Sequence, residues 1–252
     1  MKIILTIAAR EFKTLFLSPL AWTILSILQM LLAYLFLTQV ETFTNLQPRL
    51  AEIENGPGLT DIIVPPLFGN AGIILLLITP LLTMRLISEE RRNKTLTLLL
   101  SAPISSVDII VGKYLGSLGL QLLVVVMCTL MPLSLIIGGE LDLGKLFANV
   151  LALSLLISAF AAIGLYMSSI THHPTVAAIS TFGSLFLLWI IDWSNNMKDQ
   201  RSELFEYLSI LRHFQNLQSG LISSVDICYF LLFIFGFLLL SVRKLEQMRL
   251  QK

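Results

Sequence analysis

Long uncharged apolar stretches, separated by short polar segments, dominate this chain. A helix needs about 20 mostly apolar residues to cross a bilayer, because the hydrocarbon is roughly 30 Å thick and a helix rises about 1.5 Å per residue. The pattern therefore predicts an all-α protein, in which residues 1–252 form a single transmembrane domain with six transmembrane helices. The predicted spans cover about residues 20–40, 67–87, 112–137, 146–170, 175–192 and 226–243.

The fourth and fifth spans come from one apolar run that is too long for a single crossing. His172, His173 and Pro174 interrupt the run near its middle, and proline disfavours helix for the residue before it. This predicts a helical hairpin with a tight turn. The last span has only 16 uncharged residues, from 227 to 242, and is predicted to be the weakest of the six.

Residues 1–18 have the pattern of an amphipathic helix that lies in the membrane interface. Ile4, Ile7 and Phe12 fall on one side of the helical wheel, whereas Lys2 and Lys13 fall on the other. Glu11 lies on the apolar face, so its carboxylate requires a partner inside the protein. Arg10 or the loop after the second span is the expected partner; the alternative is a frayed terminus.

Three segments outside the spans carry further signals. Residues 41–66 contain the turn sequence NGPG and a Pro-Pro pair, which predict an outer loop. Residues 194–225 form a second outer loop, where apolar residues from Leu204 to Leu217 recur at helical spacing and Gly220 is the expected stop. Residues 88–106 form an inner loop with the densest mixture of positive and negative charges.

The distribution of basic residues predicts the topology. With both termini inside, twelve of the 17 lysine and arginine residues fall in the inner segments. The protein is therefore expected to be integral to the cytoplasmic (inner) membrane, with both termini cytoplasmic.

Composition supports a membrane protein and excludes several functional classes. Hydrophobic residues make up 56% of the chain and charged residues 13%, whereas soluble domains have about 25% charged residues. The net charge of +1 gives no basic footprint for nucleic acid. The sequence contains no zinc-protease, redox, hydrolase or dinucleotide-binding motif. We therefore predict no catalytic residue and no metal site, and expect the energy for any transport to come from a partner.

Two parts of the chain carry a resemblance to a known family. Residues 85–119, RLISEERRNKTLTLLLSAPISSVDIIVGKYLGSLG, resemble the region after the second span of ABC-2 type transporter permeases. The opening AAREFKTLFLSP, with Arg10 and Glu11, resembles the elbow helix of that family. Residues 207–230 resemble the outer loop of the branch with gliding-motility-type and nitrous-oxide-reductase copper-maturation-type permeases. In that loop the matching positions are His213, Phe214, Gly220 and Asp226.

The resemblance implies a permease subunit that pairs with a second copy or a paralogue and docks on a cytoplasmic ABC ATPase. The implied coupling helix lies between spans 2 and 3, and its ATPase contacts are Glu89, Glu90, Arg91, Arg92 and Thr95, with Pro103 ending it. Gly112, Lys113 and Gly116 would place the third span. The permease itself would bind no cofactor, because ATP and Mg²⁺ belong to the ATPase. Lys94 and Thr97 depart from the family pattern, which usually has Gly and Glu there.

Three functions remain open from the sequence. One is an exporter permease driven by an ATPase, in contact with membrane lipid. Another uses the ATPase to transmit conformational work to an extracytoplasmic accessory protein without moving a substrate. The third is an unpowered scaffold or channel.

Overall fold

The computed structural model describes residues 2–50, 58–101, 103–137, 141–196 and 209–250, and within them the chain is all-helical. The prediction of an all-α protein is confirmed. The elements are α1 (Lys2–Phe16), α2 (Pro19–Leu50), α3 (Leu59–Thr83), α4 (Ser88–Arg92), α5 (Leu96–Ser101), α6 (Ser106–Leu133), the 3₁₀ turn η1 (Ser134–Ile137), α7 (Leu143–Ile170), α8 (Pro174–Asn196), α10 (Ile210–Gln218) and α11 (Ser224–Leu250). The part of the predicted outer-loop helix from Leu204 to Leu208 lies outside the described residues.

Five helices in the described part of the chain are long and apolar enough to cross a membrane. They are Pro19–Arg49, Leu59–Arg92, Ser106–Ile136, Leu143–Ile170 and Ser224–Leu250. The predicted fifth span forms α8, but its apolar stretch, Pro174–Ile190, is shorter than these five. The count of six is therefore not confirmed. The last helix was expected to be the weakest, but it is 27 residues long and has the highest mean hydropathy of the five, 2.5, so that expectation is wrong.

The outer segment 41–66 is the largest correction to the predicted boundaries. Helix α2 continues to Leu50, and α3 already begins at Leu59, so most of the predicted loop is helical. Pro65 and Pro66 lie inside α3 and do not form a turn. They are the seventh and eighth residues of α3, in its second turn, so each removes one intrahelical hydrogen bond, to the carbonyl oxygen of Asp61 and of Ile62. The helix nevertheless continues through the pair to Thr83.

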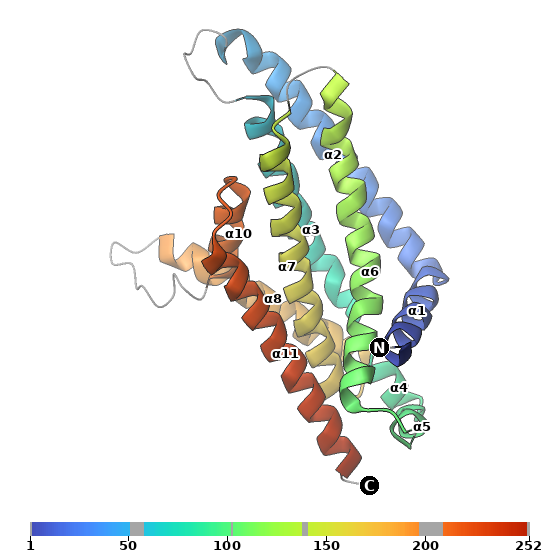
Figure 1. Ribbon diagram of the computed structural model, residues 1–252. Coiled ribbons are helices and arrows are strands. Elements are labelled where there is room, and N and C mark those ends of the chain that lie inside the picture. Colours follow the sequence, from blue (N-terminus) through green and yellow to red (C-terminus); the bar gives the residue numbers. More distant parts are fainter. Residues whose placement is uncertain (1, 51–57, 102, 138–140, 197–208, 251–252) are drawn as a thin grey trace.

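Helix α7 lies at the centre of the bundle and is the most buried of the candidate spans. It packs against α3, α6, α8, α10 and α11. Figure 1 shows its central place in the bundle. Leu153, Leu156 and Phe160 of α7 are completely buried, together with Phe68 of α3 and Phe230 of α11. The periphery exposes large apolar side chains, as expected of a surface that faces lipid.

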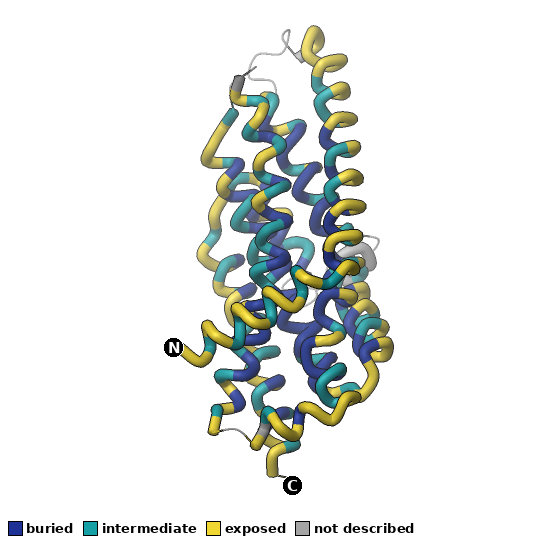
Figure 2. Tube along the Cα trace, turned by 90° about the vertical axis from the view of Figure 1, so that its right-hand side faces the viewer, coloured by how far each residue is buried: buried dark blue, intermediate teal, exposed yellow. Residues whose placement is uncertain are grey.

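Helices α1, α4 and α5 gather at one end of the bundle, where α11 also ends (Figure 1). We call this the basal end. Helix α1 does not run parallel to the spans but crosses the bundle obliquely, in the manner of an interfacial helix (Figure 2). The turn between α7 and α8 falls at Thr171–His173, with Pro174 as the first residue of α8, where its lack of an N–H group costs no hydrogen bond.

Candidate functional site

The site begins where the span helix α3 ends and the chain turns into α4. Ser168 of α7 holds this turn: its hydroxyl oxygen accepts hydrogen bonds from the backbone N–H groups of Ile87 and Ser88 at 3.0 and 3.1 Å. The same hydroxyl donates to the carbonyl oxygen of Met84 at 3.0 Å. These are groups that a helix break leaves without intrahelical partners. One serine of α7 therefore fixes the angle between α3 and α4.

A close approach of α3 and α7 supports this turn. Gly164 of α7 lies against Thr83, and a Cβ atom added at Gly164 would lie 2.7 Å from the Cβ atom of Thr83. No side chain fits between the two helices at this level. Arg91 of α4 then donates from Nη1 to the carbonyl oxygen of Ile170, 3.1 Å away at the C-terminal end of α7, where a cation is favoured by the helix dipole.

The other side of α4 is held by a charge triad, which consists of Glu11, Glu90 and Lys113. The Lys113 ammonium group lies 3.2 Å from a carboxylate oxygen of Glu11 and 2.9 Å from one of Glu90. Its side chain is only 4% exposed, whereas those of Glu11 and Glu90 are 20% and 26% exposed. The triad joins three segments, α1, α4 and α6. The expected partner of Glu11 was Arg10 or the loop after span 2; it is Lys113 of span 3, which binds that loop's Glu90 as well.

Two glycines of α6 allow α1 to reach the triad. A Cβ atom at Gly112 would lie 2.7 Å from the Cβ atom of Ile7, and one at Gly116 would lie 2.6 Å from the Cβ atom of Glu11. The two glycines that were expected to place the third span therefore form the contact with α1. Lys113 lies between the two glycines in the sequence, and its side chain reaches Glu11 of α1.

The C-terminal end of α4 forms a Schellman motif. The N–H group of Thr95 donates to the carbonyl oxygen of Glu90 at 2.9 Å, and that of Lys94 donates to Arg91 at 3.2 Å. Lys94 takes the left-handed conformation that this motif requires, with φ of 59°. This explains why glycine is usual at this position in the family that the segment resembles. Thr97 lies in the next turn, and its hydroxyl donates to the carbonyl oxygen of Lys94 at 2.6 Å.

Replacing Lys94 with glycine is expected to stabilise the protein by about 0.5–1 kcal/mol, because a side chain in the left-handed conformation costs about 1–2 kcal/mol and glycine loses part of this gain as entropy. Thermal unfolding in detergent measures the effect. Lys94→Ala removes the same charge and keeps the Cβ atom, so it is the matched control. An equal gain in both variants would assign the effect to charge and contradict the backbone explanation.

The remaining predicted coupling residues are Glu89, Arg92, Thr95 and Pro103. Arg92 and Thr95 are exposed and Glu89 is half-buried. Within the described part of the chain, neither Glu89 nor Arg92 forms a side-chain hydrogen bond or ion pair. Pro103 is exposed and follows the end of α5 at Ser101. Glu90 and Arg91 are therefore engaged internally, whereas the side chains of Glu89 and Arg92 have no hydrogen-bond or ion-pair partner among the described residues.

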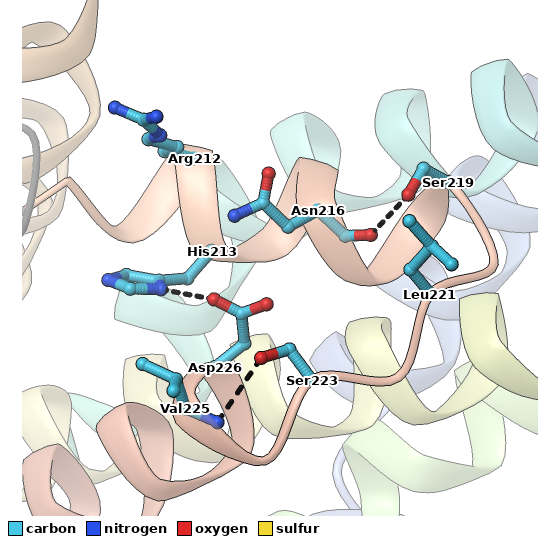
Figure 3. A pocket seen from close by; sticks show the side chains of 8 residues that line it. All are labelled: Arg212, His213, Asn216, Ser219, Leu221, Ser223, Val225 and Asp226. Carbon is cyan, nitrogen blue, oxygen red and sulfur yellow. Dashed lines mark hydrogen bonds and ion pairs between the residues drawn. The ribbon is translucent and has the colours of Figure 1, made fainter.

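The matching positions of the outer loop lie away from this end, at the junction of α10 and α11. His213 Nδ1 lies 2.5 Å from Asp226 Oδ1, and the paired side chains line a cavity of about 390 Å³ (Figure 3). The His213 ring stacks on Tyr229 with ring centroids 4.0 Å apart. Phe214 is buried in the core, and Gly220 turns the chain after α10 with φ of 91°. These four residues hold α10 on α11 and on the core.

No three histidine, cysteine, aspartate or glutamate side chains come together as metal ligands in the described ranges. What the basal end provides is a mechanical connection: a short helix held on one side by α7 and on the other by α1 and α6.

The family model of ABC-2 family transporter proteins matches residues 5–250, nearly the whole chain. The chain belongs to the ABC-2 transporter family. Among curated proteins, none matches it at a significant level.

Membership of the ABC-2 family confirms the resemblance found in the sequence. The ABC-2 chain is an integral membrane protein, and its family supplies membrane subunits that work with a cytoplasmic ABC ATPase and typically dimerise. Sequence reasoning missed Ser168, Gly164 and Thr83 as parts of the site. Nothing in the sequence sets Ser168 apart from its neighbour Ser169, because its role depends on a turn 80 residues earlier in the chain.

Proposed function

We propose that this chain is the permease subunit of an ABC transporter, with the basal end in the cytoplasm and α4 as the element that receives the ATPase. The observation that carries the proposal is the double attachment of α4. Arg91 and the turn at Ile87–Ser88 tie it to α7, and Glu90 ties it through Lys113 to α6 and α1. A displacement of α4 therefore reaches three helices at once.

The orientation is supported by charge and by the path of the chain. Most lysine and arginine residues belong to the basal side, which corresponds to the cytoplasmic side by the positive-inside rule. Helix α1 starts and α11 ends at the basal end (Figure 1), which requires an even number of crossings. Five candidate spans give an odd number. We therefore propose that α8, which runs at a steep angle to α7, makes the sixth passage and brings the chain to α10.

In this function two permease subunits pair, and ATP binding and hydrolysis on separate ATPase subunits move α4 relative to the spans. The result is export, or conformational work delivered to the outer side. ATP and Mg²⁺ would be bound by the ATPase and not by the permease. The second candidate is transmission to an extracytoplasmic partner without a substrate. Two features favour it, the extension of α2 to Leu50 and the cavity between α10 and α11, because both lie away from the basal end, on the side where such a partner would bind.

Neutralising Glu89 and Arg92 together is expected to release the ATPase while the permease stays folded, because neither side chain has an internal partner in the described structure. Affinity purification from native membranes in mild detergent, with mass spectrometry of co-purified proteins, measures the loss. For the wild type we expect an ABC-type ATPase in near-equimolar amount. For Glu89→Gln/Arg92→Gln we expect at least a tenfold reduction, about 1.4 kcal/mol or more of lost interaction.

The matched control is Arg243→Gln/Glu246→Gln, which removes one charge of each sign from exposed positions of α11 at the same end. It is expected to retain the ATPase. Equal loss in the control, or full retention in the Glu89 and Arg92 variant, would contradict the proposed interface. Absence of any ATPase from the wild-type sample would favour the scaffold reading.

A further inference from the structure

A second cavity lies at the basal end, between α1, the start of α2, the end of α3 and α4. Its volume is about 310 Å³. Its polar part includes Arg10, Arg85 and Glu89, whereas Leu15, Leu20 and Leu81 contribute an apolar part. Because α1 crosses the bundle where the spans begin, the cavity lies at the level where lipid headgroups meet hydrocarbon. Its two parts match the two chemical parts of a lipid.

The charged groups of this cavity fall into two sets. Lys113 is neutralised by Glu11 and Glu90 in the charge triad. In contrast, Arg10, Arg85 and Glu89 form no side-chain hydrogen bond or ion pair with any residue that the structure describes. Two guanidinium groups and one carboxylate therefore remain available to a ligand, from three different segments of the chain.

These groups select the chemistry of the ligand. Guanidinium groups bind phosphate through short, charge-assisted hydrogen bonds, and phosphate is the anion that every phospholipid headgroup presents. A carboxylate beside them disfavours a headgroup that is purely anionic and favours one that also carries a primary ammonium group. The six ionisable side chains of the cavity sum to zero charge, which suits a ligand of zero net charge.

We propose that the basal cavity binds one phospholipid of the phosphatidylethanolamine class. Arg10 and Arg85 bind the phosphate group, Glu89 binds the ammonium group, and the acyl chains leave along Leu20 and Leu81, which are 36% and 41% exposed. The lipid joins α1 to the ends of α3 and α4 beside the charge triad, which lines the same cavity. Glu89 also belongs to the proposed ATPase contact, so the two proposals share this residue, and the lipid is tested on the permease without the ATPase.

Native mass spectrometry of the purified, delipidated permease tests the proposal. The protein is incubated with equal amounts of dioleoyl phosphatidylethanolamine, phosphatidylcholine and phosphatidylglycerol. We expect the wild type to retain one phosphatidylethanolamine in preference to the others. Arg10→Gln/Arg85→Gln is expected to reduce retention about tenfold or more, since two charge-assisted contacts are lost. Glu89→Gln is expected to keep phospholipid binding and lose the preference for phosphatidylethanolamine over phosphatidylglycerol.

Lys2→Gln/Lys13→Gln is the matched control, because it removes two exposed positive charges of α1 that do not line the cavity. It is expected to behave as the wild type. Thermal unfolding of each sample shows that the variants are folded, and the single variants Arg10→Gln and Arg85→Gln should show intermediate losses. Undiminished binding in the double arginine variant, or equal loss in the control, would overturn the proposal. Displacement of the bound lipid by millimolar inorganic phosphate would also overturn it, in favour of a small-anion site.

Discussion

Replacing Lys113 with methionine is expected to destabilise the protein by about 3 kcal/mol, the cost of removing one partner from a buried ion pair. Methionine fills a similar volume, but it leaves the carboxylates of Glu11 and Glu90 facing each other without a cation. The two groups lie on α1 and α4, so their repulsion should separate both helices from α6. Thermal unfolding in detergent gives the loss of stability, and limited proteolysis after Lys13 reports the release of α1.

The triple variant Glu11→Gln/Glu90→Gln/Lys113→Met separates charge from packing. It contains no unpaired charge and keeps the size of all three side chains, so it is expected to recover most of the lost stability. Replacement of a complete buried ion-pair group by neutral residues is often close to neutral for stability. A triple variant as unstable as Lys113→Met would show that the shape of Lys113, and not its charge, holds the three helices together.

Replacing Gly164 with alanine is expected to have the second large effect, about 3 kcal/mol. Overpacking typically costs about 1–3 kcal/mol, and we expect the upper end where neither helix can move. The new Cβ atom would lie 2.7 Å from the Cβ atom of Thr83, and Ser168 holds the adjacent end of α3 in place. The measurement is the fraction of protein that elutes as a monodisperse species in detergent, together with its unfolding temperature.

Two variants define what this result means. Gly183→Ala is the matched control, because a Cβ atom there has no neighbour within 4 Å and alanine is the better helix former. It is expected to be neutral or slightly stabilising. Thr83→Gly/Gly164→Ala moves the side chain to the other helix and should restore much of the folding. If the double variant Thr83→Gly/Gly164→Ala folds no better than Gly164→Ala, the proposed contact is contradicted.

The sequence predicted the helices well wherever hydrophobicity alone decides the structure. The hairpin turn at His172–Pro174 and the end of α10 near Gly220 follow from proline and glycine chemistry, which is local. The segment 41–66 was predicted incorrectly because proline was read as a turn signal, whereas Pro65 and Pro66 lie early in a helix. Proline alone does not distinguish these two positions.

The contacts of the basal site were less accessible to sequence reasoning, because each depends on residues distant in the chain. Glu11 was correctly expected to need an internal partner, since a carboxylate on an apolar helix face is costly. Its partner, Lys113, is 102 residues away, and many basic residues were equally possible. Gly112 and Gly116 indicated a close helix approach without revealing that α1 is the helix that approaches.

Helix α7 connects the two ends of the molecule without interruption. Its 28 residues give a rod about 42 Å long, with the α4 attachment at Ser168 and Ile170 near one end. Near the other end, the Asn149 amide donates to the carbonyl oxygen of Gln218, which closes α10, at 3.1 Å. A tilt of roughly 5° at the base would move the far end by about 4 Å over this length. In the proposed function α7 would therefore act as a lever, so that a movement of α4 changes the position of α10 as well.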